Sequence, residues 1–105
     1  MTDAVFTALA DPTRRALIES LASNPAATAT ASALARELPI SRQAVAKHLG
    51  VLRSAELVRS AKVGRETRYA FEPRPLAEAA RWITRVGGEW DQRLDDLERL
   101  LERRR

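Results

Sequence analysis

The most informative stretch of the chain is Ser32-Ala-Leu-Ala-Arg-Glu-Leu-Pro-Ile-Ser-Arg-Gln-Ala-Val-Ala-Lys-His-Leu-Gly-Val-Leu-Arg-Ser54. Its first part predicts a short helix over residues 32–38, because Leu34 and Leu38 share one side of such a helix. Pro39 ends that helix, since proline cannot continue the backbone hydrogen bonding.

A second helix is predicted directly after a short turn. Ser41 is a good N-cap, and the helix should run to Ser54. Within it, Val45, Leu49 and Leu52 are spaced i, i+4 and i+7, so they form one buried stripe. Two helices joined by a short turn are the layout of a helix-turn-helix, which we assign to residues 32–54.

Two further helices are predicted upstream. Residues 3–10 are predicted as a short helix, with Asp3 as its N-cap and with Val5, Phe6 and Leu9 on one apolar face. The pair Asp11-Pro12 then restarts a helix that reaches about residue 22, because aspartate caps a helix and proline suits its first position. The small residues of 26–31 are interpreted as a loop.

Downstream of the helix-turn-helix, the pattern changes to an alternation of period two. Residues 57–61 and 67–71 are predicted as strands, and residues 62–66 as the turn between them, with Gly64 available for a positive φ. We therefore expect a β-hairpin, the wing, within residues 57–72.

The last third of the chain predicts one long helix over residues 76–101. Its apolar positions recur at steps of mostly three or four, which gives a stripe longer than a domain of this size needs to cover itself. Such a stripe suits pairing with a second chain. The alternative is a break at Gly87-Gly88, because each glycine costs a helix about 1 kcal/mol relative to alanine.

Composition limits the classes of function. The 105 residues suit one domain, contain no cysteine, and have one histidine, so a thiolate metal site and a multi-histidine site within one chain are excluded. No apolar run is long enough to span a membrane, and the N-terminus does not resemble a signal peptide, so we expect a soluble cytoplasmic protein without a cofactor or a membrane partner.

The positive charge is concentrated in the middle of the chain. The net charge of +4 divides into −1 for residues 1–35, +5 for residues 36–75 and 0 for residues 76–105. The excess therefore lies on the helix-turn-helix and the hairpin, which indicates a nucleic-acid partner.

The outward face of the second helix carries the candidate DNA contacts. Arginine, lysine and glutamine side chains pair with base edges, serine can hold a phosphate, and small alanines let a helix approach the major groove. With the wing cations, the predicted DNA-binding residues are Ser41, Arg42, Gln43, Ala44, Lys47, His48, Arg65 and Arg68. For His48, half-buried packing is the alternative to a phosphate contact. Of Arg14 and Arg15, one is expected to contact a phosphate and the other to form a salt bridge with Glu19 or Asp11, with Arg14 as the candidate for DNA.

The same elements in this order resemble the ArsR-type, or arsenic-repressor-like, winged-helix regulators of bacteria. The resemblance covers about residues 4–101, and its most specific segments are 6–15, 34–49, 52–58 and Gly64-Arg65 before Tyr69. It implies a mainly α fold with a small β-hairpin, namely a winged helix-turn-helix with a long C-terminal dimerisation helix.

The resemblance also implies a function. The family implies a homodimer that binds a palindromic double-stranded operator near promoters, usually as a repressor released by an effector. It implies dimerisation through residues 1–10 and 76–102, for which we predict Val5, Phe6, Leu9, Ile83, Trp90, Leu94, Leu97 and Leu101. The chain lacks the Cys-x-Cys pair of the founding members and the histidines of others, so it resembles a metal-independent branch. Glu56 occupies a position where glycine is usual.

Two other classes of function are alternatives to a DNA-binding regulator. A winged helix that serves only protein–protein interaction would stay dimeric and bind no DNA. An enzyme would need a nucleophile with a base or two carboxylates in a cleft, whereas the carboxylates here are spread over helix surfaces.

Overall fold

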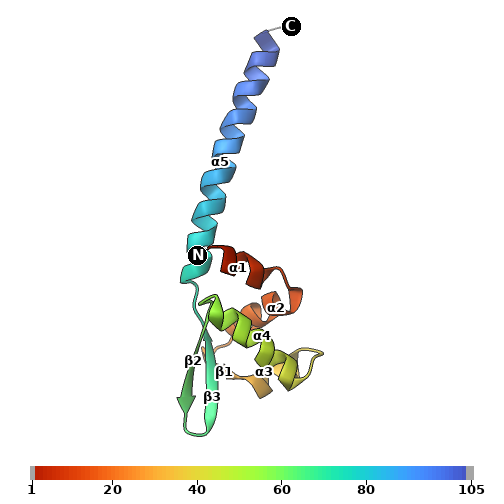
Figure 1. Cartoon of the computed structure of the whole chain (residues 1–105), viewed down its shortest axis with the longest axis vertical. Coiled ribbons are helices and arrows are strands. Elements are labelled where there is room, and N and C mark those ends of the chain that lie inside the picture. Colours follow the sequence, from red (N-terminus) through yellow and green to blue (C-terminus); the bar gives the residue numbers. More distant parts are fainter. Residues whose placement is uncertain (1, 104–105) are drawn as a thin grey trace.

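The computed structural model describes residues 2–103. Over this range the chain forms five helices and three short strands. In chain order these are α1 (Thr2–Leu9), α2 (Pro12–Ala22), β1 (Ala29–Thr30), α3 (Ala31–Glu37), α4 (Arg42–Ser54), β2 (Val58–Val63), β3 (Glu66–Phe71) and α5 (Arg74–Arg103). The winged helix-turn-helix and the long last helix are therefore confirmed (Figure 1).

Side-chain caps fix the first residues of helices α2 and α4. The Asp11 carboxylate accepts the Arg14 backbone N–H at 3.0 Å, and Pro12 is the first residue of α2. The Ser41 hydroxyl accepts the Ala44 backbone N–H at 3.1 Å at the start of α4. Both caps were predicted. Asp3 lies inside the first turn of α1, because that helix already begins at Thr2, and an acidic side chain there suits the helix dipole.

The core lies between the helices of the helix-turn-helix. The predicted stripe of α4 is confirmed, since Val45, Leu49 and Leu52 are each fully buried. They pack in one cluster with Leu17 of α2 and Leu34 of α3. This packing fixes the side of α4 that is left to face solvent.

The sheet has three antiparallel strands in the order β1-β3-β2. The hairpin pairs Val58 with Phe71 and Val63 with Glu66, so its ladder reaches closer to the tip than the predicted strands did. The turn itself is Gly64-Arg65, and Gly64 has a φ of +66°.

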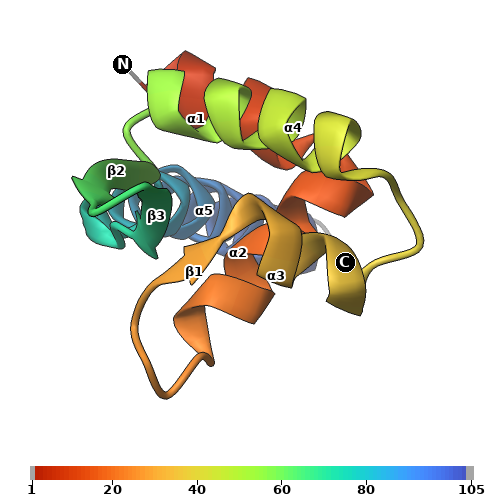
Figure 2. The same cartoon turned by 90° about the horizontal axis from the view of Figure 1, so that it is seen from below.

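The prediction of a loop over the whole of residues 26–31 was wrong. Ala29 and Thr30 form strand β1, which pairs with Tyr69 and Arg68 of β3. Ala29 is 3% exposed, because its small side chain points into the core while the flanking threonines stay at the surface of the sheet. This pairing joins the helix-turn-helix to the wing, and Figure 2 shows β1 between α3 and the hairpin.

Helix α5 is continuous from Arg74 to Arg103 and passes through Gly87-Gly88 without a break. Its first turns contact the rest of the chain: Ala79 is buried, and Trp82 meets Phe6 of α1 edge to face, with the ring centroids 5.6 Å apart. The remainder projects away from the domain (Figure 1), which gives the molecule dimensions of 71 × 25 × 24 Å.

Candidate nucleic-acid interface

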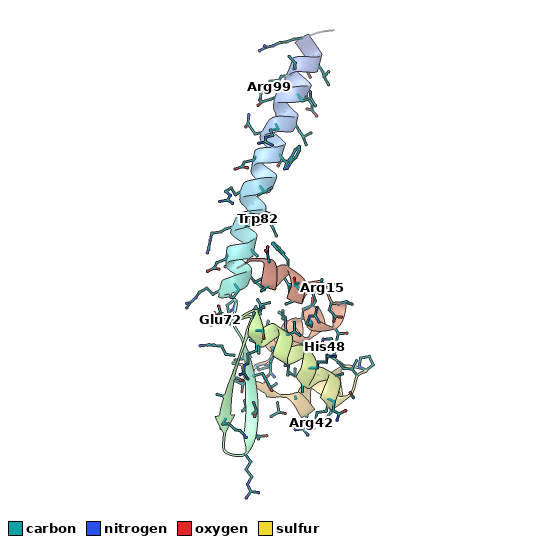
Figure 3. The ribbon with its side chains drawn as sticks, viewed as in Figure 1. Arg15, Arg42, His48, Glu72, Trp82 and Arg99 are labelled. Carbon is teal, nitrogen blue, oxygen red and sulfur yellow. The ribbon has the colours of Figure 1, made fainter. Side chains whose placement is uncertain are left out.

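The outward face of α4 is polar and basic. Ser41, Arg42, Gln43 and Lys47 are exposed, while Ala44 and His48 are half-buried. The caps and core contacts described above hold α4 in one orientation, so these side chains project from a fixed frame. Figure 3 shows Arg42 at the end of α4 that lies farthest from α5.

The wing carries its cations at and near the tip. Arg65 and Lys62 are exposed, and Arg65 occupies the second position of the two-residue turn. Arg68 is different, because its guanidinium donates from Nε to the Thr28 hydroxyl at 2.8 Å and from a terminal nitrogen to the Thr28 carbonyl at 3.2 Å. It also meets the Glu66 carboxylate at 3.4 Å. Arg68 thus links the hairpin to the segment before β1, and Arg65 is the freer cation.

The start of α4 and the tip of the hairpin lie at the same end of the molecule. Both lie at the end of the molecule opposite the free end of α5 in Figure 1, and the view from that end shows the hairpin beside the last turns of α4, with the first turn of α4 farther from it (Figure 2). The last turn of α4 is held to β2 by Arg53, which donates to the Ser60 hydroxyl at 3.1 Å. A helix and a basic hairpin at one end form a two-part surface that suits a DNA groove and its flanking phosphates.

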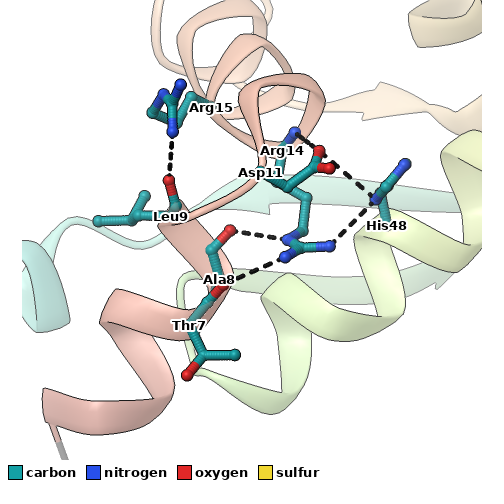
Figure 4. A network of polar contacts seen from close by, with 7 residues as sticks. All are labelled: Thr7, Ala8, Leu9, Asp11, Arg14, Arg15 and His48. Carbon is teal, nitrogen blue, oxygen red and sulfur yellow. Dashed lines mark hydrogen bonds and ion pairs between the residues drawn. The ribbon is translucent and has the colours of Figure 1, made fainter.

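A polar network holds the other side of α4 against the junction of α1 and α2 (Figure 4). The guanidinium of Arg14 donates to the Ala8 carbonyl at 2.7 Å and to the Thr7 carbonyl at 3.1 Å. Its third nitrogen lies 3.4 Å from Nδ1 of His48, which is 4.0 Å from the Asp11 carboxylate. Of the two roles expected for Arg14, the structure therefore shows an internal one, with backbone carbonyls as the main partners.

The same network affects Asp11 and His48. The backbone hydrogen bond from Arg14 lowers the pKa of the Asp11 carboxyl below its ordinary value, and this effect outweighs the opposing effect of desolvation, with smaller contributions from the neighbouring His48 and Arg14 side chains. His48 turns Nδ1 toward Arg14 and Asp11, while its other ring nitrogen points away from both (Figure 4). Half-buried packing and an outward-facing nitrogen are thus combined in this residue.

The residues predicted for dimerisation fall into two groups. Val5 is 3% exposed and packs in the core of its own chain, with Phe6 and Leu9 half-buried beside it. The members of the stripe on α5 are about half exposed, namely Ile83, Trp90, Leu94, Leu97 and Leu101.

Comparison with known proteins identifies the family. A helix-turn-helix domain family matches residues 9–61, which is half of the chain. An ArsR-like transcriptional regulator from Rhodococcus sp. RHA1 has a similar structure, with a TM-score of 0.81 and 44% sequence identity over 94% of this chain and 91% of that one. The chain belongs to the ArsR-like family of helix-turn-helix transcriptional regulators.

Curated relatives agree with this assignment. The HTH-type transcriptional regulator Rv2034 of Mycobacterium tuberculosis is 47% identical over 75 residues, which are 71% of this chain and 67% of the relative. The transcriptional repressor SdpR of Bacillus subtilis is 29% identical over 79 residues, 75% of this chain and 84% of that protein. This ArsR-like protein is accordingly a DNA-binding transcriptional regulator, and its relatives form a non-enzymatic family.

The turn after α4 contains a residue other than glycine in a left-handed conformation. Glu56 links α4 to β2 with a φ of +61°, a backbone conformation that glycine adopts without strain and other residues rarely enter. The turn therefore keeps the left-handed geometry although the residue that suits it best is absent.

Two further properties concern metals and membranes. Over residues 2–103, the regulator has no group of three or more His, Asp or Glu side chains placed to hold a metal ion. None of the helices in that range combines the length and hydrophobicity that a membrane-spanning helix needs.

Sequence reasoning missed the contribution of the segment before α3. Thr28 receives two hydrogen bonds from Arg68, and Thr30 caps α3 by accepting the Ala33 backbone N–H at 3.1 Å. The signal was present in the alternation Thr28-Ala29-Thr30, which places two β-branched residues on one side and alanine on the other. Three residues are too short a run for that pattern to predict a strand by itself.

Proposed function

We propose that this regulator is a homodimeric repressor that binds a palindromic operator, with α4 in the major groove and the wing on the adjacent backbone. The observation that carries the proposal is the exposed face of α4, where Arg42, Gln43 and Lys47 stand above a fully buried stripe. Side chains of these types pair with guanine and adenine edges, and the helix N-terminus offers amide donors to a phosphate.

The proposed contacts divide into two kinds. Arg42, Gln43 and Lys47 are assigned to base edges, with Ala44 permitting a close approach of the helix. Ser41, His48 and Arg65 are assigned to phosphates, His48 through its outward nitrogen. Arg68 is assigned a phosphate contact only in addition to its bonds to Thr28, so Arg65 is the better wing residue to test.

Dimerisation would supply the second half-site. The exposed stripe of α5 and the half-buried Phe6 and Leu9 are the surfaces that we assign to the partner. Two identical recognition helices related by a two-fold axis require two half-sites whose centres lie about one helical turn apart, or a multiple of it. The name of the relative SdpR supports repression as the outcome.

We place the protein in the cytoplasm, where bacterial DNA lies. The signal that releases it from DNA would not be a metal bound by cysteine, because the chain contains none. This agrees with the metal-independent branch that the sequence resembles.

The test is fluorescence anisotropy with an operator selected from genomic DNA and with a random duplex. Gln43→Ala or Arg42→Ala should weaken binding to the operator by about 1–3 kcal/mol and leave the random duplex nearly unaffected. Arg65→Ala should weaken both duplexes alike and reduce the salt slope by about 1.

The matched control is Arg99→Ala, which removes an exposed arginine from the far part of α5 and should leave both affinities unchanged. A dimer that binds no duplex, or binding that does not depend on salt, would refute the proposal and favour a protein–protein interaction module.

A further inference from the structure

The ring of His48 has two neighbours of opposite charge on one side. Its Nδ1 lies 3.4 Å from a terminal nitrogen of the Arg14 guanidinium and 4.0 Å from a carboxylate oxygen of Asp11. Both side chains belong to the start of α2 and approach the same ring nitrogen (Figure 4). The His48 side chain is 23% exposed, so one edge of the ring packs against the protein and the other edge reaches the surface.

The two neighbours make opposite demands on the ring. A neutral imidazole carries one hydrogen, so one of its nitrogens donates a hydrogen bond and the other accepts one. A guanidinium can only donate, so the contact with Arg14 requires that Nδ1 of His48 accepts and that the hydrogen lies on Nε2. A carboxylate can only accept, so Asp11 favours the tautomer with the hydrogen on Nδ1.

The geometry favours Arg14 in this competition. Its nitrogen is the nearer of the two groups, and the 4.0 Å between Asp11 and Nδ1 exceeds the length of a hydrogen bond. The same oxygen of Asp11 already accepts the Arg14 backbone N–H at 3.0 Å. The guanidinium is also fixed in place, because its other two nitrogens donate to the carbonyls of Ala8 and Thr7. Its third nitrogen is thereby held toward the ring.

We propose that Arg14 is a positioning residue for DNA binding, which keeps the hydrogen of His48 on the outward Nε2 so that this nitrogen can donate to a phosphate of the duplex. This role rests on the phosphate contact proposed above for His48. Nε2 points away from both Arg14 and Asp11 (Figure 4), and phosphate oxygens accept hydrogen bonds. With the hydrogen on Nδ1 instead, a lone pair of Nε2 would face the phosphate and repel it.

The other side of the ring offers no competing charge. The residues one turn before and after His48 on α4 do not titrate, namely Ala44, Val45, Val51 and Leu52. Lys47 is exposed on the outward face of the helix. Within residues 2–103, the hydrogen-bond and ion-pair contacts of the ring are those with Arg14 and Asp11. These two groups therefore decide which tautomer forms.

Nitrogen NMR of the free protein reads the tautomer directly, because the chain contains a single histidine. The protein is labelled with ¹⁵N and measured at about pH 8, well above the ordinary pKa of histidine. A ring nitrogen without a hydrogen resonates far downfield of one that carries a hydrogen. In the native protein Nδ1 should show the first kind of signal and Nε2 the second. A hydrogen on Nδ1, or an equal mixture, would overturn the inference.

Variants of Arg14 test whether this residue selects the tautomer. In Arg14→Met the donor is lost and Asp11 is left as the neighbour of Nδ1, so the hydrogen should shift toward Nδ1. Arg14→Lys retains a donor and should keep more of the native tautomer than Arg14→Met does. Arg15→Met is the matched control, because Arg15 donates to the Leu9 carbonyl and has no contact with the ring. A native spectrum for Arg14→Met would overturn the inference.

A second variant keeps the test decisive if Arg14→Met does not fold. Asp11→Asn removes the carboxylate and retains a residue that can cap α2. It should leave the hydrogen on Nε2, because Arg14 remains as the donor to Nδ1. A shift of the hydrogen to Nδ1 in this variant would contradict the assignment of Arg14 as the group that decides.

A double-mutant cycle measured by fluorescence anisotropy connects the tautomer to DNA. His48→Ala and Arg14→Met should each weaken binding to the operator and to a random duplex by about tenfold, since each removes a donor to a charged phosphate. The double variant should lose about tenfold as well, because Arg14 acts through His48. A hundredfold loss would show that Arg14 acts on α4 independently of the ring and would refute the positioning role.

The two measurements separate this inference from the proposed function. A native protein that binds its operator with the hydrogen on Nδ1 would overturn the positioning role and leave the operator-binding regulator standing. A native protein with the hydrogen on Nε2 that binds no duplex would overturn the proposed function, and the role of Arg14 in DNA binding with it.

Discussion

Arg14 should contribute more to stability than its surface position suggests. Its guanidinium donates to the carbonyls of Ala8 and Thr7, which belong to the last turn of α1, where backbone carbonyls run out of helical partners. The Thr7 carbonyl also accepts the Ala10 backbone N–H at 3.3 Å, so its bond to Arg14 is the less important of the two. A hydrogen bond with a charged donor contributes about 1.5–3 kcal/mol, and the half-buried setting favours the lower end. Allowing for water that replaces part of the bonding, Arg14→Ala should lower the free energy of unfolding by about 2–3 kcal/mol.

The neighbouring arginine is a matched control. Arg15 is exposed and donates to one carbonyl, that of Leu9 at 2.6 Å, so Arg15→Ala should cost less than about 1 kcal/mol. Arg14→Lys should recover less than half of the loss, because a single ammonium does not reproduce two parallel bonds of a guanidinium. Urea unfolding followed by circular dichroism, at one fixed protein concentration, measures all three variants.

Two results would refute this reasoning. One is an Arg14→Ala protein whose unfolding free energy lies within about 0.5 kcal/mol of the native value, which is the usual range for an unimportant surface substitution. The other is an equal loss for Arg14→Ala and Arg15→Ala, because the structure assigns the two arginines different numbers of carbonyl partners.

Three further predictions use the same unfolding assay. Glu56→Gly should stabilise the protein by about 1 kcal/mol, since glycine relieves the left-handed conformation, and Glu56→Ala should not. Because the pKa of Asp11 is lowered in the folded state, its charge stabilises the protein above the ordinary carboxyl pKa, and this stabilisation is lost as the pH falls through the folded pKa. The difference in unfolding free energy between the native protein and Asp11→Asn should therefore shrink between about pH 5 and pH 2. A difference that stays constant over this range would contradict the prediction. Leu49→Ala should cost about 2–5 kcal/mol, whereas Val51→Ala, 36% exposed, should cost far less.

Local patterns explain why most of the fold could be predicted. The caps at Asp11 and Ser41 and the stripe from Val45 to Leu52 depend on residues three to seven positions apart, so a single sequence contains them completely. The long helix was predicted from its apolar period. Its continuity through Gly87-Gly88 depended on whether the cost of two glycines exceeds the stability of the rest of a 30-residue helix, and it does not.

Long-range partners explain what was missed. Strand β1 has only two residues, and its pairing with β3 joins positions about 40 residues apart, so neither length nor local period indicates it. The same distance separates Arg68 from Thr28. An arginine at this position could be expected to contact a phosphate or a carboxylate. The main partners of Arg14 are instead backbone carbonyls of the preceding helix, and every residue type has such a carbonyl, so the sequence does not indicate the contact.

The pairing of β1 with β3 has a consequence for the DNA itself. Because Ala29, Thr30 and the Arg68–Thr28 bonds join the hairpin to the helix-turn-helix, the spacing between α4 and the hairpin is set before any duplex binds. Helix α4 and the hairpin are therefore held at a fixed separation. A duplex whose groove width or twist does not match this separation must deform in order to bind. The sequence of base pairs that no side chain contacts should therefore also influence affinity, because it sets the energy of that deformation.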